Sequence, residues 1–92
     1  MKTLRIAAVL AGLLLGVQLQ AQILVGQTAG FTGTSAVGVK EITDGALLYI
    51  DAINARGGVN GQKIELIQLD DKFDPKLAAE NARTLIEQRN VV

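Results

Sequence analysis

Along the chain, short apolar runs typical of strands alternate with longer segments in which apolar residues recur at helical spacing. The pattern therefore predicts strands and helices in alternation. Residues 23–28 form a short, continuous apolar run, as expected for a strand covered on both faces. Residues 63–69 predict a second strand, in which apolar positions partly alternate with polar ones. The pair Val91-Val92 is predicted to begin a third strand. Between the first strand and the next element, residues 29–36 are rich in Gly, Thr and Ser and predict an accessible loop.

The segment between the first two strands predicts a helix from about Val39 to Arg56. Apolar residues recur on one helical face, at Ile42, Ala46, Tyr49, Ile50 and Ile53. Tyr49 is therefore expected in the core. Gly57-Gly58 should end the helix, because glycine readily takes the left-handed conformation, and Asn60-Gly61 predicts a tight turn.

A second helix is predicted to begin at Asp74-Pro75. Aspartate can cap free backbone N–H groups, and proline suits the first helical position. The buried stripe of this helix is predicted at Leu77, Ala78, Asn81, Ala82, Leu85 and Ile86. Just before the helix, Asp70 and Asp71 are interpreted as turn-forming and capping residues. A carboxylate pair for acid–base or metal chemistry is the alternative.

The order of elements is β-α-β-α-β, an α/β arrangement whose helical crossovers predict a parallel sheet with right-handed connections. Parallel strands need both faces covered, and a third strand of two residues cannot complete a sheet. We therefore expect the sequence to be the N-terminal part of a longer protein.

Residues 1–21 have the three-part pattern of a secretory signal peptide. Lys2 and Arg5 give a positive start, residues 6–17 are uncharged and largely apolar, and Ala21 stands at a plausible cleavage position. The apolar run is shorter than the roughly 20 residues that a bilayer span needs. We expect a cleaved leader, a mature chain from residue 22 that does not span the membrane, and export to a periplasm-like compartment.

Composition excludes several classes of chemistry. The chain has no Cys and no His, so it offers no thiolate metal site, no imidazole acid or base and no Ser-His-Asp triad. Nine basic and nine acidic side chains give no net charge, and aromatics make up 3% of the chain, so nucleic-acid binding is not expected. We expect no catalytic residues, no cofactor and no bound metal.

Three spaced blocks resemble one known family. The run DAINARGGVNGQKIEL at residues 51–66 is similar to a signature of the type I periplasmic solute-binding proteins, in the branch that serves branched-chain amino acid ABC transporters. DDKFDP at residues 70–75, with the helix that follows, matches the family's next block, and residues 25–29 with Thr32-Gly33 fit its opening strand and loop. The resemblance covers about residues 23–92.

The resemblance implies two α/β lobes that close on a small solute, here a branched-chain amino acid or a related small amide or carboxylate, and then dock on a membrane permease. The chain would be the start of lobe one, and most of the family's ligand contacts would lie beyond Val92. The loop after the first strand should face the cleft. Its candidate ligand-binding residues are Phe31, Thr32, Thr34 and Ser35. Some relatives carry a tyrosine where this chain has Val37, which leaves the exact ligand open.

Other interpretations remain open at this point. The loop hydroxyls could bond their own backbone or cap the helix, and Phe31 could pack within the lobe. A dinucleotide-binding enzyme is disfavoured, because Gly26, Gly30 and Gly33 do not have the G-x-G-x-x-G spacing. The ligand-sensing domain of a receptor could share the fold. The 92-residue chain could also be the whole product, in which case it could not close a cleft.

Overall fold

The computed structural model describes residues 21–92, so the predicted signal peptide lies outside the described residues except for Ala21. The described chain runs β1 (Ile23–Ala29), α2 (Ala36–Ala55), β2 (Ile64–Asp70) and α3 (Pro75–Glu87). The two strands pair in parallel along their whole length, from Ile23 opposite Ile64 to Ala29 opposite Asp70. The first four elements of the predicted order and the parallel pairing are confirmed.

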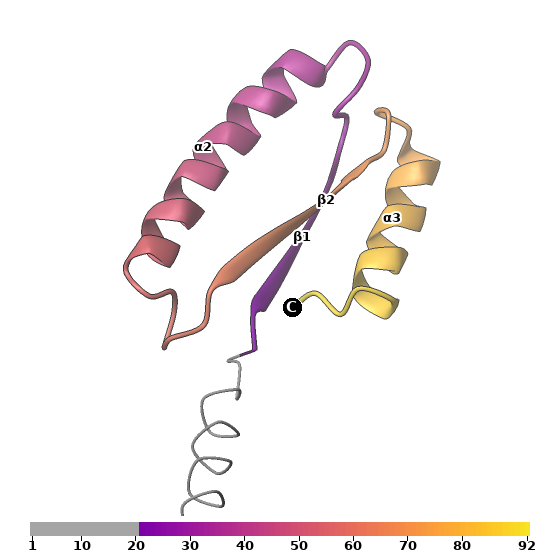
Figure 1. Cartoon of the computed structure of the whole chain (residues 1–92). Helices are drawn as coiled ribbons and strands as arrows, with labels where there is room; N and C mark the ends of the chain where they lie inside the picture. Colours follow the sequence, from indigo (N-terminus) through magenta and orange to yellow (C-terminus); the bar gives the residue numbers. More distant parts are fainter. Residues whose placement is uncertain (1–20) are drawn as a thin grey trace, which may run out of the picture.

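The two helices lie on opposite faces of the two-stranded sheet (Figure 1). Successive side chains of a strand point to opposite faces, and two neighbours on β1 show this. Gln27 Nε2 donates to Thr43 Oγ1 of α2 at 3.0 Å, whereas Thr28 Oγ1 accepts from Asn81 Nδ2 of α3 at 3.1 Å. This layering explains why the apolar run of β1 is continuous, since both of its faces are covered.

The predicted third strand does not form at Val91–Val92, because two residues are too few for a ladder. The Val92 N–H nevertheless donates to the Leu24 carbonyl at 2.9 Å. The Ile23 N–H donates to the carbonyl of Lys63, the residue just before β2, so the carbonyl of Leu24 points to the opposite edge of β1. Within the described residues, β1 therefore lies between β2 and the end of the chain.

The rotation of α2 about its axis differs from the prediction. Ile42 and Tyr49, expected on the buried face, are 73% and 68% exposed, and Ala46 is exposed as well. Thr43 is instead the buried residue of the helix, at 4% exposure. Apolar residues surround much of this helix, so periodicity does not fix its rotation, and the hydrogen bond between Thr43 and Gln27 favours the observed one.

A second polar contact holds the C-terminal end of α2 against the start of β2. The side-chain amide of Asn54 donates to the Ile64 carbonyl, and its carbonyl accepts from the Ile64 N–H, both at 2.8 Å. Gly57 and Gly58 follow with φ of 100° and 82°, which ends the helix as predicted. Asn60-Gly61 then turns the chain, so that Val59 and Gln62 pair as an isolated antiparallel bridge.

The start of α3 agrees with the prediction, whereas the burial of its residues near the C-terminal end differs in part. The Asp74 side chain accepts from the Lys76 N–H at 3.0 Å, and Pro75 occupies the first turn. Leu85 is buried against the sheet, where Ile67 of β2 is the other buried apolar residue. Ile86, predicted in the buried stripe, is exposed, because the helix turns Leu85 rather than Ile86 toward Gly26 of β1.

We predict that Asn54→Ala destabilises the intact protein by about 2 kcal/mol, because it leaves two backbone groups of Ile64 without their partners. Urea denaturation monitored by circular dichroism would measure the loss. Asp51→Ala, an exposed position on the same helix, is the matched control and should change the free energy of unfolding by less than about 0.5 kcal/mol. Equal stability of the two variants would contradict the role given to Asn54.

Candidate functional site

The candidate site lies at the carboxyl ends of β1 and β2. In parallel α/β sheets, ligands bind outside this end of the strands. Two short segments meet there, the loop of residues 30–35 between β1 and α2 and the turn of residues 71–74 between β2 and α3 (Figure 1). They meet because the ladder ends with Ala29 opposite Asp70.

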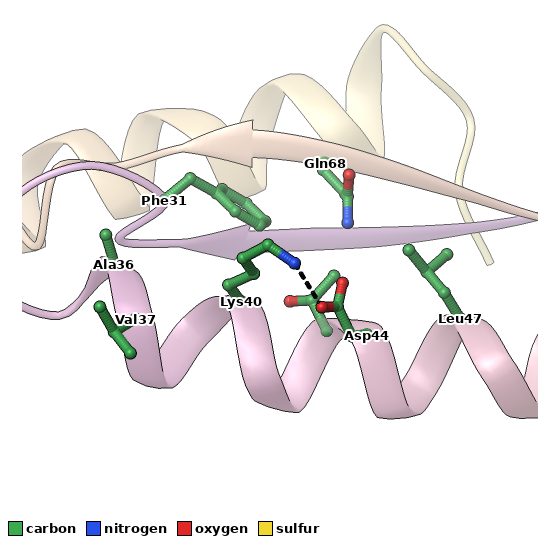
Figure 2. A pocket seen from close by; sticks show the side chains of 8 residues that line it. Phe31, Ala36, Val37, Lys40, Asp44, Leu47 and Gln68 are labelled. Atoms are coloured by element: carbon green, nitrogen blue, oxygen red, sulfur yellow. Dashed lines mark hydrogen bonds and ion pairs between the residues drawn. The ribbon is translucent and has the colours of Figure 1, made fainter.

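Phe31 is the apolar member of the loop. Its N–H donates both to the Ala29 carbonyl and to Asp70 Oδ1, each at 3.0 Å. Its partly buried ring lines a groove of about 370 Å³ between α2 and the sheet. Figure 2 shows the ring on the strand side of this groove, facing the helix residues across it. The other lining residues are Ala36, Val37, Lys40, Thr43, Asp44, Leu47 and Gln68.

The groove has a largely apolar floor and a charged rim. Lys40 and Asp44, one turn apart on α2, form an ion pair beside Phe31 (Figure 2). The hydrogen bond to Asp44 and the charge of Asp44 raise the pKa of Lys40 above its usual value. Both side chains are exposed, so the pair adds little stability. Its effect is to neutralise the charge at this rim.

Thr32 bonds to the neighbouring strand rather than to its own helix. Its Oγ1 donates to Asp70 Oδ2 at 2.7 Å. A hydroxyl has one hydrogen to donate and two lone pairs that accept. With its hydrogen bound to Asp70, the Thr32 hydroxyl can accept a hydrogen bond from a ligand ammonium, but it cannot donate one to a ligand carboxylate.

The other two predicted site residues lie at the start of α2. Ser35 is the N-cap, yet its side chain makes no capping bond, and it is partly buried. Thr34 is exposed, and its hydroxyl has no hydrogen bond within residues 21–92. Thus Phe31 and Thr32 are brought together by Asp70, whereas Thr34 and Ser35 share the loop without joining that cluster.

Asp70 is the residue on which the loop contacts converge. Its carboxylate accepts from the N–H groups of Phe31 and Lys72 and from the Thr32 hydroxyl. The hydrogen bond from Thr32, followed by that from Lys72, holds the pKa of Asp70 below its usual value. The expected turn-forming role of Asp70 is confirmed, but its contact with the first loop was not foreseen.

Asp71, the next residue, belongs to a second set of hydrogen bonds. Its buried carboxylate accepts from the Thr28 hydroxyl at 3.0 Å and from the Phe73 N–H at 2.9 Å. Asn81 of α3 completes the set by donating to Thr28 Oγ1 and to the Asp70 carbonyl. This cluster joins β1, β2 and α3, whereas the side chain of Asp70 bonds to the loop between β1 and α2.

The turn after β2 has an unusual backbone. Lys72 and Phe73 are consecutive non-glycine residues with φ of 52° and 60°, a conformation that each adopts at a cost of about 1–2 kcal/mol. The two aspartates offset this cost by binding their N–H groups. Phe73 passes over Gly30, and its ring is 73% exposed. Sequence reasoning missed Phe73 as a site residue, and its only signal was an apolar residue inside a polar turn.

Within residues 21–92, no three acidic side chains gather closely enough to hold a metal ion. Neither described helix combines the length and the apolar character that a membrane crossing requires.

Comparison with known proteins identifies the family to which the chain belongs. Residues 22–92 match the family model for periplasmic binding proteins, and the chain belongs to this family of solute-binding proteins. An amino acid binding protein of Pseudomonas aeruginosa is 35% identical over 72 residues, which are 78% of this chain and 19% of that protein. A Leu/Ile/Val-binding protein homolog of Brucella suis is 38% identical over 88 residues, 96% of this chain and 21% of the relative. The chain thus spans about a fifth of the length of these curated relatives.

Solved structures give the same fold. The substrate-binding protein LivJ of a branched-chain amino acid transporter from Streptococcus pneumoniae, solved with isoleucine, superposes with a TM-score of 0.72 at 32% identity. The match covers 77% of this chain and 20% of LivJ. A fatty acid ABC transporter substrate-binding protein from Thermomonospora curvata gives a TM-score of 0.68 at 34% identity, over 80% of this chain and 18% of that one. The α/β fold expected from the resemblance is confirmed.

We predict that the contribution of Asp70 to stability depends on pH. Because its folded pKa is lowered, the contribution is fully present above the usual value of 3.8 and is lost as the pH falls through the folded pKa. Asp70→Asn resembles the protonated form. The difference in unfolding free energy between wild type and Asp70→Asn should stay constant from about pH 7 to pH 5 and shrink below about pH 4. A difference that does not change with pH, in urea titrations at each pH, would refute the lowered pKa.

Proposed function

We propose that this chain is the N-terminal part of lobe one of a periplasmic solute-binding protein that delivers its ligand to an ABC importer. The observation that carries the proposal is the match to the family over residues 22–92, together with a loop at the carboxyl end of the sheet. A second lobe would come from sequence after Val92. The ligand would be enclosed when the two lobes close, and the closed form would dock on the permease.

The proposed ligand is a branched-chain amino acid or a related small amide or carboxylate. Relatives named for leucine, isoleucine and valine support it, and so does the character of the loop. Phe31 supplies an apolar surface for an aliphatic side chain, and Thr32 can accept a hydrogen bond from an ammonium group. Thr34 and Ser35 remain candidates for contact with the ligand. Their hydroxyls are not engaged by the helix cap or by Asp70.

This function requires binding and no chemical step. The described residues contribute surfaces and hydrogen-bonding groups, and ATP hydrolysis by partner subunits would supply the energy for import. Residues 1–21 would act as a signal peptide that directs the chain to the periplasm and is then removed.

A fatty acid is the second candidate ligand, because the relative from Thermomonospora curvata is a fatty acid binder of the same fold. The two ligands differ in the group that the loop must meet. An amino acid presents an ammonium group, which can donate a hydrogen bond to the Thr32 hydroxyl oxygen. A fatty acid presents only a carboxylate and a long alkyl chain.

We predict that the intact protein binds leucine, isoleucine or valine with a dissociation constant of micromolar or below, as measured by isothermal titration calorimetry. Phe31→Ala should weaken that binding by about tenfold, because an aromatic surface is removed from the cleft wall. Tyr49→Ala, which removes an exposed aromatic from the outer side of α2, is the control and should bind as tightly as wild type. Binding of palmitate and of none of the three amino acids would overturn the amino acid proposal.

We also predict that the intact protein recovered from a periplasmic extract begins near Gln22 and is several times heavier than residues 22–92. Intact-mass spectrometry and N-terminal sequencing would measure both. A product that matches residues 22–92 alone would contradict the two-lobe mechanism, since one partial lobe cannot enclose a ligand. A product that retains Met1 would contradict the cleaved leader.

A further inference from the structure

We propose that Asp70 is a positioning residue that sets the ligand loop in its binding geometry before the ligand arrives. The inference rests on the proposed function, because it concerns the loop that carries Phe31 and Thr32. It assigns Asp70 no contact with the ligand. Its effect on affinity would come through the backbone of Phe31 and the hydroxyl of Thr32.

The first support is the number and origin of the bonds to this one carboxylate. Oδ1 accepts from the Phe31 N–H at 3.0 Å and from the Lys72 N–H at 2.9 Å, and Oδ2 accepts from Thr32 Oγ1 at 2.7 Å. Two of the three donors belong to the loop after β1, which lies 38 or 39 positions away in the sequence. The carboxylate therefore links the loop that precedes α2 with the turn that precedes α3.

The second support is the absence of a competing partner. Among residues 21–92 the one ion pair is Lys40–Asp44, so no described cation draws the Asp70 carboxylate away from the loop. Hydrogen bonds to a charged acceptor are roughly twice as strong as those between neutral groups. A loop held by two such bonds loses less conformational freedom when it meets a ligand, and this raises affinity.

The third support is the difference between Asp70 and its neighbour. Asp71 is buried and bonds to Thr28 within β1 and to Phe73, so its contacts hold the framework. Asp70 is less buried and bonds to residues of the loop. The two adjacent aspartates thus have separable roles, which makes Asp71 a matched control for Asp70.

The test compares variants of the full-length protein by calorimetric titration with leucine, thermal unfolding and hydrogen–deuterium exchange of the ligand-free state. Asp70→Ala should weaken leucine binding about tenfold and speed exchange at the Phe31 and Lys72 amides by a similar factor. Asp70→Asn should restore part of the affinity, because its side-chain carbonyl can still accept from both amides. Thr32→Val should weaken binding more in the wild type than in Asp70→Ala, because part of its effect in the wild type depends on the hydrogen bond to Asp70.

The control separates positioning from general stability. Asp71→Asn should lower the melting temperature while leaving leucine affinity within about twofold of wild type. If Asp71→Asn folds poorly, Thr28→Val removes one bond of the same cluster and serves the same purpose.

Each possible result either supports or overturns the proposed role of Asp70. Unchanged affinity and unchanged exchange in Asp70→Ala would overturn it, as would additive effects of Thr32→Val and Asp70→Ala. A loss of affinity that merely follows the loss of melting temperature across all variants would also overturn it. If wild type does not bind leucine, the proposed function fails on that point alone, and the exchange rates of Phe31 and Lys72 still decide whether Asp70 holds the loop.

Discussion

Seven residues of β1 pair in parallel with seven residues of β2, and this register places Ala29 next to Asp70. The remaining contacts of the site depend on that placement. Asp70 reaches the loop after β1 because the two strands end together, and Asp71 reaches Thr28 for the same reason. A shift of one residue would turn the side chains of β2 to opposite faces and separate these groups. The register is thus the constraint that assembles the candidate site.

Polar contacts fix what hydrophobic burial leaves undetermined in this chain. The hydrogen bond between Gln27 and Thr43 sets the rotation of α2 over the sheet. The two hydrogen bonds of Asn54 to Ile64 hold the end of α2 at the start of β2. Hydrophobic contact alone is not directional and scales with area. A helix with apolar residues around most of its surface can therefore pack in several rotations. Specific hydrogen bonds select one of them.

Much of the fold could be predicted from the sequence because its local signals agree with one another. Gly57-Gly58, Asn60-Gly61 and Asp74-Pro75 each fix a boundary through backbone chemistry that acts over a few residues. The rotation of α2 could not be predicted, since Ile42 and Tyr49 follow a helical period as well as the residues that actually face the sheet. The exposure of Ile86 was missed for a similar reason, because Leu85 beside it has the same apolar character.

The position of the candidate loop at the end of β1 could be predicted, whereas its hydrogen bonds could not. The rule that ligands meet the carboxyl ends of parallel strands located the loop at Phe31 and Thr32. The bond from Thr32 to Asp70 joins residues 38 positions apart, and no local pattern encodes it. The left-handed conformation of Phe73 was equally hidden, because it depends on a side chain that binds its N–H rather than on a glycine.

The long separation between paired strands has a consequence for the order in which the chain can fold. Paired residues of β1 and β2 are 41 positions apart (Ile23 and Ile64, 64 − 23), so β1 has no strand partner until β2 has been made. At about 5–20 residues per second, this leaves an apolar strand unpaired for a period on the order of seconds during synthesis. During that time the emerging chain exposes an apolar strand to which a chaperone can bind before the sheet forms.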